Sequence, residues 1–288
     1  MSTLPVTPTL DPEPAVPSPT SHDEDPDRGW RYITRTLPDG RESWETVPLT
    51  EADFLDPQEG DVMPQRPVHA QVIRDLHNML EAHYRQDPTY SVFHDLKMEW
   101  GIPGLERPSP DIAVVPGVRN PGAIEGMFYV QQEGTRPVLV IEVVSPGYVD
   151  ADTHPAKKGR IYATAGVQEF VILDPEGYSG TPVAGYRLER GRRYQAIPLD
   201  ADGLVPCRSL NLTIGLDGAQ AVVVDRSTGQ RLLTHTEQIA RAEAAEARAA
   251  EAEVRAATEA KARASAETAL ARLQAELQRL RRISGEER

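Results

Sequence analysis

The sequence predicts an α/β domain with a mixed central sheet flanked by helices, followed by a long C-terminal helix. Three apolar, β-branched runs bounded by Pro or Gly predict buried strands: PDIAVVP, PVLVIEVVS and QEFVILDP. Amphipathic helical segments precede and separate these strands, which favours a sheet with helices packed against it. From residue 235 to residue 280 the chain has neither Gly nor Pro and is rich in Ala, Glu and Arg, which predicts a single long helix.

Composition divides the chain into three parts. Residues 1–29 form a Pro-rich acidic leader with almost nothing apolar to bury, so we expect it to be disordered. Residues 30–234 form the globular body, which we expect to be the catalytic domain. Residues 235–288 form the helical tail, in which Leu270, Leu273, Leu277 and Leu280 have heptad spacing. The end of the tail therefore predicts either a coiled coil, with homo-oligomerisation through it, or a solvated single helix.

The body can be assigned element by element. VPLTEADFL predicts a short helix opened by Thr50, because acidic residues occupy its first turn. VHAQVIRDLHNMLEAHY has apolar residues at helical spacing, whereas TYSVFHDLKMEW alternates as a half-buried strand does. PAKKGRIYATAG predicts a helix with Pro155 early in it and Gly166 at its end. VAGYRLERGRRYQAIP predicts a hairpin that turns at Arg190 and Gly191.

Composition also excludes several classes of protein. A net charge of −13 argues against unspecific adhesion to nucleic acid, which depends on Lys and Arg, but an acidic body suits divalent metals. Cys207 is the only cysteine, which excludes an internal disulfide and a multi-cysteine zinc site. No apolar run is long enough to span a bilayer, and the N-terminus does not resemble a secretory signal. We therefore expect a cytoplasmic protein without a membrane segment.

Two carboxylates at the ends of apolar strands are the candidate metal ligands. Asp111 begins PDIAVVP, and Glu142 lies within VLVIEVVS among residues that would be buried on both faces. A buried carboxylate is costly unless it is paired or binds a metal, so Glu142 needs a partner. Oxygen ligands of this kind suit Mg²⁺ or Mn²⁺. Asp111 alone is about equally well explained as a turn residue after Ser-Pro.

A lysine near these carboxylates would complete a phosphodiester-hydrolysing site. Lys157 and Lys158 begin the helix that follows the Glu142 strand, so the chain could return one of them to the carboxylates. Such an ammonium can stabilise charge in the transition state. Tyr162 lies one turn beyond Lys158 and is predicted to hold the lysine or a phosphate. Taken alone, Lys158 is also consistent with a solvated helix residue.

The blocks PSPDIAVVPGV, VLVIEVVSPGY and KKGRIYATAGVQEFVILDP resemble the Uma2 family of restriction-endonuclease-like proteins, members of the PD-(D/E)XK nuclease superfamily. The resemblance extends from about Val47 to Val224. It implies a restriction-endonuclease-like fold and Mg²⁺-dependent cleavage of DNA. It also implies that Asp111 and Glu142 bind the metal and that Lys158, four residues before Tyr162, is the catalytic lysine.

The sequence departs from the pattern of this family at several positions. Val144 occupies the place of the lysine of the (D/E)XK motif, which is why the assignment moves to Lys158, with Lys157 as the fallback. Many relatives have an acid four residues before that lysine, where this chain has His154 and, as the nearest substitute, Asp152.

Two further positions bear on the family's early segment. Where many relatives carry a Glu-containing run, this chain offers Glu59 or Asp61 as replacements. His69, at the start of the first long helix, resembles a histidine that is often found there, and it is equally consistent with a residue that hydrogen-bonds at a helix start.

Two main hypotheses follow. The first is a Mg²⁺-dependent DNA endonuclease in which Asp111, Glu142 and Lys158 form one cluster. The second, motivated by the acidic body and the departures from the motif, is a non-catalytic protein that keeps the nuclease fold and uses its coiled-coil tail for binding or assembly. A DNA-contacting tail is a weaker third hypothesis, because the charge of the tail is balanced.

Overall fold

The structure is a computed structural model that describes residues 27–87, 89–154, 157–190 and 193–285. It divides into two compact units, a body that ends at Leu232 and a second unit that begins at Leu233. Most of the leader predicted to be disordered lies outside the described residues, as do Pro155 and Gly191, where a helix start and a hairpin turn were predicted. Among the described helices, none is both long and apolar enough to cross a membrane.

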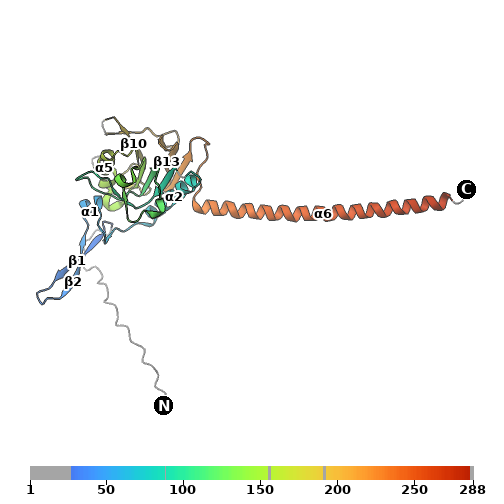
Figure 1. Ribbon diagram of the computed structural model, residues 1–288, viewed down its shortest axis with the longest axis horizontal. Coiled ribbons are helices and arrows are strands. Elements are labelled where there is room, and N and C mark those ends of the chain that lie inside the picture. The colour runs from blue at the N-terminus through green and yellow to red at the C-terminus, as the bar shows by residue number, and fades with distance from the viewer. Residues whose placement is uncertain (1–26, 88, 155–156, 191–192, 286–288) are drawn as a thin grey trace, which may run out of the picture. The chain divides into compact units, whose positions relative to one another are not determined.

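A six-stranded mixed sheet forms the centre of the body (Figure 1). Its strands lie in the order β11 (Arg193–Ala196), β10 (Val183–Glu189), β9 (Glu169–Leu173), β8 (Leu139–Val143), β6 (Ile112–Pro116) and β4 (Tyr90–Phe93). Strands β8 and β9 are parallel, and the other neighbouring pairs are antiparallel. The three apolar runs of the sequence form β6, β8 and β9, which are almost entirely buried because both faces of the sheet are covered. The predicted mixed sheet is confirmed.

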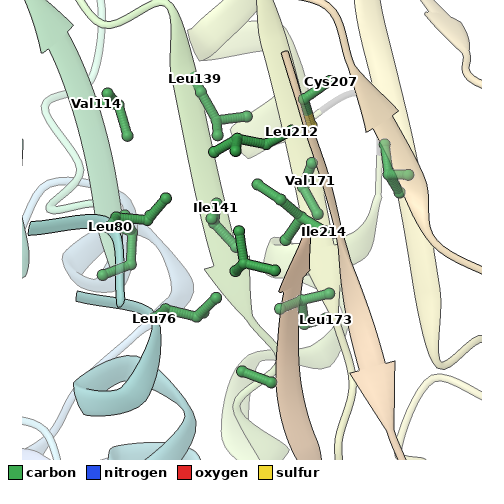
Figure 2. Packing of buried hydrophobic residues seen from close by; sticks show 14 of the residues in the cluster. Leu76, Leu80, Val114, Leu139, Ile141, Val171, Leu173, Cys207, Leu212 and Ile214 are labelled. Carbon is green, nitrogen blue, oxygen red and sulfur yellow. The ribbon is translucent and has the colours of Figure 1, made fainter. Parts of the chain in front are cut away.

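One face of this sheet is covered by helix α2 (Pro67–Tyr84) and by a second, antiparallel sheet. The strands of the second sheet are β12 (Val205–Cys207), β13 (Leu212–Asp217) and β14 (Gln220–Asp225). Helix α2 was predicted from its apolar spacing, whereas the second sheet was not predicted. Figure 2 shows this core, in which fully buried residues from α2, the central sheet and the second sheet meet: Leu76, Leu80, Val114, Leu139, Ile141, Val171, Leu173, Cys207, Leu212 and Ile214.

The other face is covered by helix α5 (Lys158–Ala165) and by the parallel strand pair β5 (Lys97–Glu99) and β7 (Met127–Tyr129). Its core is more aromatic than the first and includes Phe128, Tyr162 and Phe170. Helix α5 ends at Gly166 as predicted, because this residue adopts the left-handed conformation (φ 83°) that closes a helix.

The predicted strand in TYSVFHDLKMEW is wrong in its extent. The segment forms two strands, β4 and β5, which belong to different sheets. Asp95 lies between them with φ 48°, a left-handed conformation that breaks a strand. Its backbone N–H donates to the Pro110 carbonyl at 3.1 Å, so the break brings Asp95 to the start of β6.

The first part of the body forms a small module of its own. Strands β1 (Trp30–Thr36), β2 (Glu42–Pro48) and β3 (Asp61–Val62) make an antiparallel sheet that the sequence did not predict. Helix α1 (Glu51–Leu55) was predicted and begins at Thr50 with a reciprocal capping box between Thr50 and Asp53. The remaining short helices of the body are η1 (Pro121–Ala123), α3 (Val130–Glu133), η2 (Pro146–Tyr148) and α4 (Val149–Thr153).

The second unit consists of helix α6 (His235–Gly285), which confirms the long helix predicted for the tail. The helix opens with a capping box, in which Glu237 N–H donates to Thr234 Oγ1 at 3.3 Å and Thr234 N–H donates to Glu237 Oε2 at 2.8 Å. The four leucines at heptad spacing are between 55% and 60% exposed. Their apolar stripe is therefore open to solvent.

Candidate active site

A pocket of about 190 Å³ opens where β6 and β8 diverge at one end of the central sheet. Continued by one residue, the register of these two strands places Asp111 opposite Glu142. Beyond this point the Pro110 carbonyl bonds to Asp95 instead of to β8. The Val143 N–H, which has lost its strand partner, donates to Asp111 Oδ2 at 2.7 Å. The Asp111 carboxylate thus replaces a bond of the sheet and is fixed at the pocket.

Glu142 lies near the end of β8 and has no exposed surface. A buried carboxylate requires donors, and α5 provides two of them. Lys158 Nζ donates to Glu142 Oε2 at 2.8 Å, and the Tyr162 hydroxyl donates to Oε1. Lys158 and Tyr162 can both reach Glu142 because residues four apart lie on the same face of a helix.

The Lys158 ammonium lies between two carboxylates. It contacts Glu142 Oε2 and Asp152 Oδ1, each at 2.8 Å, and its side chain is only 4% exposed. Asp152 belongs to α4 and is itself held, since its Oδ2 accepts the Ser145 N–H at 2.9 Å. The ring of Phe54 in α1 also lies over the ammonium, with 4.3 Å from Nζ to the ring centroid.

The site gathers more acidic groups than basic ones in a buried position, which shifts the pKa values of its side chains. Burial raises the pKa of Asp111 to about 7 and that of Glu142 to about 8, against the opposing effect of the Lys158 charge. The carboxylates surround one ammonium, so their protons belong to the group as a whole. Despite burial, the neighbouring acids Asp152, Glu142 and Asp111 raise the pKa of Lys158. Lys158 is therefore protonated at neutral pH in this arrangement.

His69 closes the pocket from the start of α2. Its Nε2 donates to the Val143 carbonyl at 3.0 Å and lies 3.8 Å from Asp111 Oδ2. Burial lowers the pKa of His69, so its ring is neutral at neutral pH. With the proton on Nε2, the buried Nδ1 is an acceptor that has no hydrogen-bond partner among the described residues. Val143 thus links the two residues, because its N–H bonds to Asp111 and its carbonyl bonds to His69.

The structure brings together the three residues that the sequence predicted as a site. Asp111 and Lys158 line the same pocket. Glu142 contacts Lys158, and its two oxygens accept hydrogen bonds from Lys158 and Tyr162. Lys157, the fallback, instead forms ion pairs with Glu51 and Asp150 near the surface. Tyr162, which was predicted to hold the lysine or a phosphate, donates to the carboxylate that holds the lysine.

The residues predicted to replace the acids of the family, Asp152, Asp61 and Glu59, lie in different surroundings. Asp152 reaches the lysine, although it stands two residues away from the expected position, because the short helix α4 directs it inward. Asp61 lines the pocket, but both of its carboxylate oxygens accept hydrogen bonds from Arg31. Glu59 is exposed. Sequence reasoning missed Phe54 altogether, because nothing in its own segment indicates contact with a helix about 100 residues later.

The donor set was compared with the needs of a divalent cation. No group of three or more His, Cys, Asp or Glu in the described part of the chain is arranged to hold a metal ion. Mg²⁺ often binds through only one or two carboxylates and keeps several waters. Asp111 offers one oxygen that bonds to no described residue. Asp111, Glu142 and Asp152 around one ammonium, with Asp95 in the same pocket, would leave an excess of negative charge if all were ionised. A divalent cation offsets such an excess, so the residues fit such an ion.

A mixed sheet with carboxylates and a lysine gathered where two of its strands diverge defines a nuclease-like α/β protein. The chain belongs to the Uma2 family, described as "Putative restriction endonuclease", whose sequence profile matches residues 57–217. The predicted resemblance is therefore confirmed, within slightly narrower limits. Among solved structures, the chain is similar to a "putative nuclease belonging to DUF820" from Anabaena variabilis, with 23% identity over 53% of this chain and 80% of that chain and a TM-score of 0.38. No curated protein matches the chain.

Proposed function

We propose that this protein is a metal-dependent endonuclease that uses Mg²⁺ or Mn²⁺ to hydrolyse phosphodiester bonds of DNA. The observation that carries the proposal is the buried Lys158 ammonium, which is shared by Glu142 and Asp152 beside the pocket that Asp111 faces. A structural ion pair needs only one carboxylate for each lysine, so the additional acids are better explained by a cationic ligand. Membership of a family described as "Putative restriction endonuclease" supports the same chemistry.

Each residue has a distinct role in this proposal. Asp111, which lines the pocket, and Glu142, which lies beside Lys158, would hold the cation. When bound, a divalent cation lowers the pKa of a coordinated water and polarises a phosphoryl oxygen. Lys158, which stays protonated, stabilises the negative charge that develops on the phosphate. Asp152 holds the ammonium from the side of α4.

Nicking of supercoiled plasmid DNA in Mg²⁺ or Mn²⁺, with EDTA as the blank, tests the proposal. We expect cleavage by the full chain and its loss in Glu142→Gln and in Lys158→Met. Arg160→Met is the matched control, because Arg160 lies on the same helix but its side chain is 48% exposed and pairs with Glu106. A folded protein that binds the metal but leaves single-stranded and double-stranded DNA intact would refute the endonuclease and favour a non-catalytic member of the fold.

We place this activity in the body, residues 30–234, and the protein in the cytoplasm. The candidate site draws its residues from α1, α2, β8, α4, α5 and the residue before β6, all of which precede the tail. A chain truncated after Thr234 should therefore keep its metal binding and its cleavage. Loss of both in a truncated body that remains folded would show that the tail contributes to the site.

The tail carries a second proposed function, self-association into a parallel coiled coil. The exposed stripe of leucines gives the apolar seam, with Leu270 and Leu277 at one core position and Leu273 and Leu280 at the other. In this register Glu276 and Arg281 occupy the flanking positions that meet across a parallel dimer. An antiparallel pairing would instead place Glu276 opposite its own copy, so charge favours the parallel arrangement.

Sedimentation velocity over a series of protein concentrations tests this function independently of cleavage. The full chain should show a mass that rises from one to two chains with concentration, and Leu273→Asn should abolish the rise. Glu276→Arg and Arg281→Glu should each weaken the dimer, and the double exchange should restore it. A full chain that stays monomeric throughout would identify the tail as a solvated single helix.

A further inference from the structure

Helix α1 brings an aromatic ring to the candidate active site from outside the segment that matches the family. The Uma2 match begins at residue 57, whereas Phe54 lies in α1 and lines the pocket. The ring centroid of Phe54 is 4.3 Å from Lys158 Nζ, well within the range of a cation–π interaction. A residue outside the matched segment therefore contacts the Lys158 ammonium of the site.

We propose that Phe54 is a positioning residue that holds the Lys158 ammonium between Glu142 and Asp152. An ammonium has three N–H groups, and these two carboxylates account for two of its contacts. The negative face of an aromatic ring attracts the cation without forming a hydrogen bond that a phosphate would have to displace. The ammonium is thus held in place and remains able to face an anionic substrate. The role in cleavage rests on the proposed nuclease function, but the positioning does not.

The anchoring of α1 supports this role, because a positioning residue must itself be fixed. Ion pairs tie the helix and the residue after it to three other elements: Glu51 to Lys157 beside α5 at 2.5 Å, Asp53 to Arg31 in β1 at 3.0 Å, and Asp56 to Lys97 in β5 at 2.8 Å. Leu55 is buried in the aromatic core. Helix α1, which carries Phe54, is therefore held both by these ion pairs and by the packing of Leu55.

Simple packing is the competing explanation, and the choice of substitution separates the two. Leu at position 54 keeps an apolar side chain over the lysine but removes the ring face. Tyr or Trp keeps the ring face and alters the volume. If Phe54 acts only by filling space, Leu at position 54 should protect Lys158 at least as well as Trp does. If Phe54 acts on the Lys158 ammonium, only an aromatic residue at position 54 should protect Lys158.

Reactivity of individual lysines, measured by reductive methylation and peptide mass spectrometry on the full chain, tests the proposal without any need for nuclease activity. In the wild type, Lys158 should be strongly protected relative to Lys261, which is exposed on α6. We expect Phe54→Leu to raise the labelling rate of Lys158 by about 2-fold to about 30-fold, the range of cation–π energies. Phe54→Tyr should retain the protection. Phe93→Leu, a matched change elsewhere in the same core, should leave Lys158 protected.

The outcomes keep the two proposals distinguishable. Equal labelling of Lys158 in the wild type and Phe54→Leu would overturn the positioning role, whatever the protein cleaves. Aromatic-dependent protection would establish it even if no DNA is cleaved. If the protein does cleave DNA, Phe54→Leu should lower kcat with little change in KM, and Phe54→Tyr should restore kcat. A change confined to KM would count against the role.

Discussion

Replacing Lys158 with Met tests whether the carboxylates of the site depend on a single ammonium. The side chains of Lys158, Glu142 and Asp152 are 4%, 0% and 1% exposed, so water screens their charges only weakly. Removing one partner of a buried ion pair destabilises a protein by about 3–5 kcal/mol, because a charge is left without compensation. Met keeps most of the volume of the lysine stem, so this loss is electrostatic. At about 2–4 °C per kcal/mol, Tm should fall by roughly 6–20 °C.

Denaturant unfolding of the full chain in EDTA measures this loss at about pH 9, where the carboxyls of the site are ionised. The fluorescence of buried Trp100 follows the unfolding. Arg160→Met, which removes an exposed ion pair on the same helix, should cost no more than about 1 kcal/mol. The double variant Lys158→Met with Glu142→Gln should be more stable than Lys158→Met alone, because Gln carries no charge. The double-mutant cycle should therefore show a coupling of at least about 1 kcal/mol.

The pH dependence of the same variant gives an independent check on the cause. Without the ammonium, the pKa values of the buried carboxyls rise further, so these groups take up protons more readily as pH falls. Protonation removes the uncompensated charge, and the penalty of Lys158→Met should shrink from about pH 9 towards about pH 7, because the folded pKa values of Asp111 and Glu142 already lie near 7 and 8 with the ammonium present. A loss below about 1 kcal/mol at about pH 9, or a loss that does not change with pH, would refute the electrostatic reasoning.

Three further predictions concern charge and packing. Without a divalent ion, the stability of the wild type relative to Glu142→Gln should fall as pH rises from about 4.5 to about 8. The reason is that the pKa of Glu142 is higher in the folded protein than in the unfolded chain, and thermal melts at several pH values measure the change. Asp111→Asn should abolish the rise in Tm on addition of Mn²⁺, and an undiminished rise would place the metal elsewhere. Gly185→Ala should cost about 1–3 kcal/mol, because the added Cβ would lie 2.3 Å from Val205 Cγ1. Gly122→Ala, where the nearest atom is 4.0 Å away, should be nearly neutral in the same unfolding assay.

The parts of the fold that could be predicted from the sequence are those with a local physical signature. Strands β6, β8 and β9 are continuous apolar runs because both faces of the central sheet are buried. The β4–β5 break could not be predicted, since it depends on the left-handed backbone of Asp95, which the contact with Pro110 stabilises. The β12–β14 sheet was also missed. Strands β13 and β14 nevertheless form a hairpin in which Asp217 pairs with Gln220, and the Asp-Gly sequence at its tight turn is a local signal.

The site was predictable to the extent that strand ends determine it. Asp111 and Glu142 lie opposite each other because an antiparallel register pairs the start of one strand with the end of the next. Asp152 could be named only as a substitute, since its position depends on how the short helix α4 turns. Phe54 was beyond reach because its contact with Lys158 is entirely tertiary.

The choice between the two adjacent lysines had a sequence signal that depends on helical period. Helix α5 buries one face, which contains Lys158, Ile161, Tyr162 and Ala165, at spacings of three, four and seven from the lysine. Lys157 does not belong to this face and pairs with Glu51 and Asp150 instead. A lysine in line with apolar residues must be buried, and a buried lysine must find carboxylates. The helical spacing that packs one face of α5 on the sheet therefore also places Lys158, and not Lys157, next to Glu142.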